Sequence, residues 1–167
     1  MKYVVLVMLM VIGASAQAWP EGNWRYEATG YDELRQQHGI IAVNQPVSPD
    51  IDGWQEDEVL LSFSHNPKHG AMIFLKSNST AFDCEKICEV NFRFDDDQIE
   101  TVYFFNFPSS PDMLTLMNDN AIKFFEEIKT SDILILEVKR KHKSSEQFKY
   151  YLEGFMATPA EDAKSEG

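Results

Sequence analysis

The stretch CEVNFRFDDDQIETVYFF, residues 88–105, indicates most clearly how this chain folds. Within residues 90–94, valine and two phenylalanines alternate with asparagine and arginine, which is the period-two pattern of a β-strand with one buried face. Three consecutive aspartates, residues 95–97, then predict a polar turn. The run at 99–105 predicts a second strand that pairs back onto the first. We therefore expect an antiparallel hairpin at the centre of the fold.

Apolar runs on both sides of this hairpin extend the predicted sheet. VLLSFS (59–64) and AMIFLK (71–76) are separated by a loop that contains proline and glycine, so they predict another hairpin. We expect the two hairpins together to form a four-stranded antiparallel meander. Further strands are predicted at MLTLM (113–117), ILILEV (133–138) and FKYYLEGF (148–155).

One helix is predicted near residues 119–130. Asn118 or Asp119 can cap its first turn. Its apolar residues recur at helical spacing, which indicates an amphipathic helix with one face on the core. The residues expected on that face are Ile122, Phe124, Phe125 and Ile128. The expected fold class is therefore α+β and mainly β, with an antiparallel sheet or sandwich and this helix packed against it.

The N-terminus, MKYVVLVMLMVIGASAQA, has the form of an export signal. Lys2 supplies the positive start, an apolar stretch follows, and alternate alanines at its end suit cleavage by signal peptidase. A membrane-spanning helix needs roughly 20 apolar residues, so we expect no stable membrane insertion and a periplasmic or secreted protein. The expected organisation is a signal peptide (1–18), one β-rich globular domain (19–156) and a disordered tail (157–167).

The two cysteines, Cys84 and Cys88, stand in a C-x3-C pattern. An oxidising compartment favours a disulfide between cysteines this close in sequence. A zinc site needs more ligands than two thiols, and no histidine lies near them in sequence. We expect a structural disulfide that holds the turn before the central hairpin.

The segment CEKICEVNFRFDD, residues 84–96, carries a resemblance to a known family. It resembles a motif in exported bacterial and prophage-borne proteins, in which two cysteines run into C-x-V-x-[VF]-R-F-D-D. The likeness continues through 120–138 and ends at 148–155. It implies an exported bacterial protein whose strand begins at the second cysteine. Asp97 departs from the family, which commonly has glycine there, so we expect a different hairpin turn.

No motif in the chain points to catalysis or to a bound cofactor. His65 and His69 are four residues apart, but Pro67 forbids the regular helix that would bring them together as metal ligands. The aspartates at 95–97 lack the alternating spacing of a calcium loop, so we interpret them as a solvated turn. We therefore expect a protein that is not an enzyme and that needs no cofactor or metal.

The charge of the chain is unevenly distributed. The net charge is −12, which disfavours nucleic acid as a partner and suits a basic protein. Against this background KRKHK, residues 139–143, is a basic run. It fits either a solvated hairpin end or an electrostatic handle for an acidic partner, and the solvated end is the favoured interpretation. Arg93 is interpreted as a salt-bridge residue, with a binding surface as the alternative.

These observations lead to a functional hypothesis. We expect an exported, non-enzymatic binding protein of the bacterial periplasm whose partner is another protein, such as an inhibitor or immunity protein against a basic envelope-targeting hydrolase. A structural component of the cell envelope and an envelope hydrolase with unassigned carboxylates are the alternatives. An aromatic residue ringed by acids suits a binding hot spot. The predicted partner-binding residues are Trp54, Asp50, Asp52, Glu56, Asp57 and Glu58.

Overall fold

The computed structural model describes residues 24–34, 37–46, 58–66 and 70–155. Within these ranges the chain forms nine β-strands and one helix, which confirms the predicted mainly-β class with a single helix. The expected signal peptide and C-terminal tail lie outside the described residues. The elements are β1 (Trp24–Asp32), β2 (Gln37–Asn44), β3 (Val59–Asn66), β4 (Gly70–Ser77), β5 (Ile87–Phe94), β6 (Glu100–Phe107), β7 (Ser110–Met117), α1 (Asn118–Thr130), β8 (Ile133–Lys139) and β9 (Ser145–Tyr151).

All nine strands belong to one antiparallel sheet with the order β1-β2-β3-β4-β7-β6-β5-β8-β9. Of the two arrangements expected, a sheet or a sandwich, the structure has the single sheet. The two predicted hairpins are confirmed as β3–β4 and β5–β6. The four-stranded meander is wrong, because β4 pairs with β7 and not with β5. One strand, β7, therefore lies between the two predicted hairpins.

The segment that joins β4 to β5 explains this order. Residues 78–86 run across one end of the sheet instead of making a tight turn. The N–H of Phe82 donates to the carbonyl of Pro111 at 3.0 Å, and the N–H of Asp83 donates to that of Lys139 at 2.9 Å. Pro111 belongs to β7 and Lys139 to β8. The segment thus carries the chain from β4 to a position beside β8, where β5 begins. Strands β6 and β7 then occupy the space between β5 and β4.

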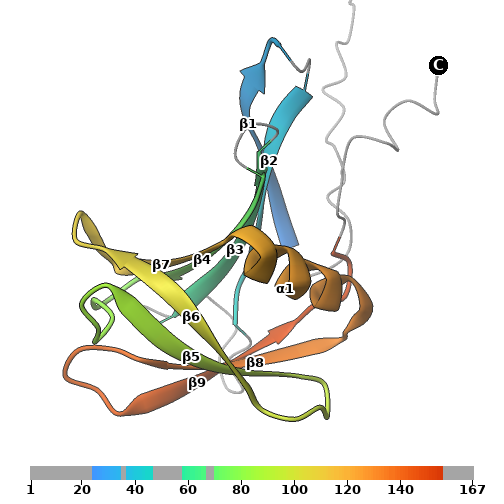
Figure 1. The fold of residues 1–167 in the computed structure, drawn as a ribbon. Helices are drawn as coiled ribbons and strands as arrows, with labels where there is room; N and C mark the ends of the chain where they lie inside the picture. The colour runs from blue at the N-terminus through green and yellow to red at the C-terminus, as the bar shows by residue number, and fades with distance from the viewer. Residues whose placement is uncertain (1–23, 35–36, 47–57, 67–69, 156–167) are drawn as a thin grey trace, which may run out of the picture.

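The sheet is strongly curved (Figure 1), and β9 with the residues that follow it contacts β1, β2 and the start of β3. Side chains, not a strand pair, make this closure, and Tyr150 is fully buried there. Burial raises the pKa of the Tyr150 hydroxyl, which stays protonated as a donor. The strand predicted at 148–155 ends at Tyr151, and the carbonyls of Leu152 and Gly154 beyond it accept side-chain bonds. The closing bonds run from Trp24 Nε1 to Leu152 O (3.1 Å), Tyr26 Oη to Gly154 O (3.2 Å), Asn44 Nδ2 to Tyr151 O (2.7 Å) and Tyr150 Oη to Val59 O (2.6 Å).

Helix α1 joins β7 to β8 and lies across one face of the sheet, which we call the inner face (Figure 1). The residues that α1 buries are Ala121, Phe124 and Ile128, whereas Ile122 is 50% exposed, so the predicted apolar stripe is partly wrong. The predicted cap is also absent: the N-cap residue is Met117, and no side chain bonds there. Because β7 runs directly into the helix, the cap position falls on the last strand residue and Asn118 turns the chain with a positive φ of 63°.

The sulfurs of Cys84 and Cys88 lie within disulfide-bonding distance, with their Cα atoms 5.5 Å apart. Cys88 is buried on the inner face of β5, where it is paired in register with Phe104 of β6. Cys84 packs against the same core. The cross-link therefore holds the segment that crosses the sheet end against the start of β5, as the sequence predicted.

Replacing both Cys84 and Cys88 by serine should lower the free energy of unfolding by about 2 kcal/mol, because the closed loop holds only three intervening residues and its entropic effect is small. Urea unfolding of the oxidised protein and the double variant measures this difference. Reductant should destabilise the parent protein by the same amount and leave the variant unchanged. Equal stability of the parent with and without reductant would contradict the prediction.

Candidate functional site

The predicted acidic patch falls mostly outside the described residues, since Trp54, Asp50, Asp52, Glu56 and Asp57 all belong to the segment 47–57. Glu58 is described, directly precedes β3 and is only 6% exposed. Its backbone carbonyl accepts a bond from the N–H of Asn78 at 3.0 Å. Glu58 therefore does not present its side chain to a partner in this structure.

The residues considered as metal ligands do not form a site in the described part of the chain. His65 is exposed, and His69 lies outside the described residues. Among the described residues, no three or more histidine, cysteine, aspartate or glutamate side chains are placed so that they could hold a metal ion together. The turn predicted to be solvated has a structural role, because the Asp95 carboxylate accepts the N–H groups of Asp132 and Ile133 at 3.1 and 2.8 Å. Asp95 thus ties the β5–β6 turn to the start of β8.

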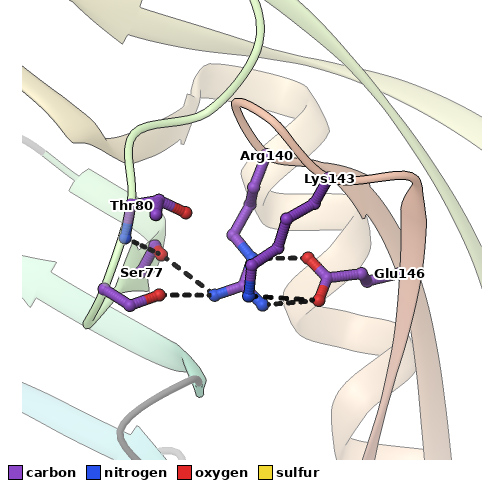
Figure 2. A network of polar contacts seen from close by, with 6 residues as sticks. Ser77, Thr80, Arg140, Lys143 and Glu146 are labelled. Atoms are coloured by element: carbon purple, nitrogen blue, oxygen red, sulfur yellow. Dashed lines mark hydrogen bonds and ion pairs between the residues drawn. The ribbon is translucent and has the colours of Figure 1, made fainter.

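The basic run 139–143 forms the β8–β9 hairpin, but its arginine is not solvated. Arg140 is 1% exposed, and its guanidinium binds both carboxylate oxygens of Glu146 at 2.7 Å (Figure 2). Its third nitrogen donates to the hydroxyls of Ser79 at 3.1 Å and Ser77 at 3.4 Å. The guanidinium also lies 5.3 Å from the ring of Phe148. The favoured interpretation of this run as a solvated hairpin end is therefore wrong for Arg140.

Two other cations of the run are also engaged in ion pairs. Lys139 pairs with Asp83 at 3.0 Å, and Lys143 lies 3.6 Å from Glu146 (Figure 2). Lys141 and His142 are exposed at the turn. Much of the charge that stands out in the sequence is thus used to join the β8–β9 hairpin to the segment between β4 and β5. The hairpin is therefore a structural joint.

A row of exposed aromatic residues lies on the outer face of the sheet, opposite α1. Tyr103, Phe105 and Phe107 alternate along β6 and are 57%, 43% and 43% exposed. Ile87, 59% exposed, stands beside Phe105 on the neighbouring strand β5. Alternate residues of a strand lie roughly 6.8 Å apart, so the three rings form a continuous apolar strip. Such a strip on a sheet face is the kind of surface that marks an interaction site.

A ladder of polar side chains continues the outer face beyond the aromatic row. Thr101 donates to Asn91 Oδ1 at 2.8 Å, and Asn91 donates to one oxygen of Glu137 at 3.2 Å. Gln147 donates to the other oxygen of Glu137 at 3.0 Å. Hydrogen bonds from Gln147 and Asn91 lower the pKa of the Glu137 carboxyl. The ladder therefore crosses β6, β5, β8 and β9 and holds a carboxylate at its centre.

Arg93 lies next to this ladder. It lines a shallow hollow of about 210 Å³ together with Ile99, Ile135 and members of the ladder. Arg93 is half-buried and stands beside Ile135 in the sheet register. The outer face thus presents aromatic, apolar, acidic and cationic groups in one continuous area, which we call the outer-face surface (Ile87, Tyr103, Phe105, Phe107, Asn91, Arg93, Glu137 and Gln147).

Sequence reasoning did not find this surface. Residues 99–105 were correctly predicted as a strand, yet aromatic side chains occur on both of its faces, so composition does not tell which face is buried. The residue that indicates which face is buried is Asn106. It is 5% exposed, and its side chain donates to the carbonyl of Pro111 at 3.1 Å. Had Asn106 been recognised as facing inward, its neighbours Phe105 and Phe107 would have been expected to face outward.

Comparison with protein-family models, with curated proteins and with solved structures found no match to this chain. Among the residues that the structure describes, no helix is long and apolar enough to span a bilayer.

Proposed function

We propose that this protein is an exported, non-enzymatic binding protein of the bacterial periplasm that recognises another protein through its outer-face surface. An inhibitor or immunity protein against an envelope-targeting hydrolase is the most concrete form of this function. The leader sequence, the closely spaced cysteine pair and the resemblance to exported bacterial proteins support the location.

The exposed aromatic row carries the proposal. Aromatic residues are enriched among the few positions that dominate binding energy at protein interfaces. Tyr103, Phe105 and Phe107 stand on a rigid central strand, so a partner would meet them already ordered. The flanking ladder from Thr101 to Gln147 supplies hydrogen-bonding groups of the kind that surround such an aromatic core.

The test compares two aromatic substitutions in quantitative capture from the periplasmic extract of the source bacterium. The partner recovered by the parent protein should bind Phe105→Ser roughly 30-fold more weakly, which corresponds to the loss of about 2 kcal/mol at a hot spot. Tyr151→Ser is the matched control, because Tyr151 is 40% exposed but lies on the edge strand β9. Both variants should unfold at the parent's urea midpoint.

Equal binding of the partner by the parent and Phe105→Ser would reject the outer-face surface. A third variant, Trp54→Ala, tests the acidic segment that the sequence suggested. Loss of the partner by Trp54→Ala alone would assign the binding to that segment instead. An assay of the recovered partner for hydrolysis of cell-wall material, with and without this protein, then decides whether the protein acts as an inhibitor.

A further inference from the structure

A groove lies on the inner face of the sheet, between α1 and strands β5 and β6. Its volume is about 780 Å³. The groove exists because α1 packs on β4 and β7 at one side of the sheet, with Ala121 and Ile128 turned inward, and does not fill the space above β5 and β6. The outer-face surface lies on the opposite side of the same strands. No residue of the set that defines the outer-face surface lines the groove, although Thr101 of the polar ladder does.

Aromatic rings form the floor of this groove. Phe92 lies 4.9 Å from Phe124 and 5.7 Å from Phe94, and Phe94 lies 5.1 Å from Phe124, measured between ring centroids. Val102 and the half-exposed Ile122 extend this apolar lining from the sheet to the helix. The floor is thus pre-formed by packed side chains, as in most ligand pockets.

Carboxylates dominate the rim. Asp97 and Glu100 stand on the sheet side and Glu126 and Glu127 on the helix side, against Lys123 as the one cationic residue of the lining. Among the described residues Glu126 pairs with Lys129 of its own helix, whereas no ion pair involves Asp97, Glu100 or Glu127. An apolar floor with a negative rim is complementary to a ligand that has both apolar and cationic groups.

We propose that this groove binds a short cationic amphipathic peptide segment of a partner protein. The α1 residues that line it run from Asn120 to Glu127, roughly 11 Å along the helix axis, which matches three to four residues of an extended peptide. Apolar side chains of the segment would contact Phe92 and Val102, and its lysine or arginine side chains would reach the rim. This proposal does not depend on the outer-face surface.

The test measures the fluorescence anisotropy of a labelled hexapeptide of alternating lysine and leucine. We expect saturable binding that weakens roughly tenfold in the variant Glu100→Gln/Glu127→Gln, because two carboxylates of the rim are lost. The control pair is Glu89→Gln/Glu153→Gln, which removes the same charge from two exposed positions outside the groove. The control should bind like the parent protein, within a factor of two.

Two further variants distinguish binding in the groove from binding elsewhere on the protein. Ile122→Ser should weaken the peptide severalfold, because it removes a half-exposed apolar group of the lining without touching the core. Phe105→Ser should leave the peptide affinity unchanged. Equal weakening by both glutamate pairs would show attraction to net charge alone and would overturn the proposal. Absence of saturable binding, or full binding by Ile122→Ser, would overturn it as well.

Discussion

Replacement of Arg140 by methionine should lower the free energy of unfolding by about 3 kcal/mol. The guanidinium is buried and holds both oxygens of Glu146, the hydroxyls of Ser77 and Ser79, and the ring of Phe148. Removal of one partner of a buried ion pair leaves the other charge poorly solvated, which costs roughly 3–5 kcal/mol. The lower value applies here because the side chain of Glu146 is 27% exposed and Lys143 lies close to it.

Urea unfolding monitored by tryptophan fluorescence measures this loss. Lys141→Met is the matched control, because it removes the same charge from the adjacent, exposed position and should change stability by less than about 0.5 kcal/mol. Arg140→Lys should recover only part of the loss, since an ammonium cannot bind both carboxylate oxygens in the planar fork. A stability of Arg140→Met within about 1 kcal/mol of the parent would mean that the hairpin is not a structural joint.

Replacement of Trp24 by alanine should lower the free energy of unfolding by about 4 kcal/mol, which is the usual cost of deleting a buried tryptophan side chain. Trp24 is 2% exposed, packs 4.7 Å from Phe155 and 5.6 Å from Phe63, and donates to the Leu152 carbonyl. It therefore joins the first strand to the residues that follow the last one. Loss of the ring leaves a cavity at the closure of the sheet.

One variant separates ring packing from the hydrogen bond of Trp24, and a second variant serves as a control for the loss of an exposed ring. Trp24→Phe keeps an aromatic ring and loses the N–H, so it should cost about 1 kcal/mol. Tyr151→Ala removes an exposed ring from β9 and should cost less than about 1 kcal/mol. Calorimetry or urea unfolding gives each value. If Trp24→Ala proves no more destabilising than Tyr151→Ala, then the sheet does not depend on this contact.

Local patterns were sufficient to predict most of the elements. The period-two alternation at 90–94 and the apolar runs at 59–64, 71–76 and 133–138 all correspond to strands, and the helix falls within one residue of its predicted range. Such patterns depend only on which faces of a segment are buried, and that information is local. The pairing of β4 with β7 was not predicted, because it depends on the path of residues 78–86 across the sheet end.

The candidate surfaces were harder to predict than the strands. The aromatic row is hidden in a segment with aromatic residues on both faces, and the inward-facing Asn106 bonds the carbonyl of Pro111 in β7 near the register shift between β6 and β7. The groove depends on where α1 settles, and Ile122 is exposed since Ala121 takes the buried position beside it. Whether a small residue such as alanine occupies the buried face of a helix depends on how closely the helix packs on its neighbours. The spacing of apolar residues in the sequence does not show this.

The amino-acid order alone thus specified a mainly-β chain with a late helix and a closely spaced cysteine pair at the start of the central hairpin. Folding in three dimensions determined the strand order, the burial of Arg140 and the side chains that close the sheet. The physical reason is the range of the interactions. Periodicity and turn chemistry act between neighbours in sequence, whereas Arg140 and Ser77, or Trp24 and Leu152, are 63 or 128 positions apart and meet only once the chain between them has been placed.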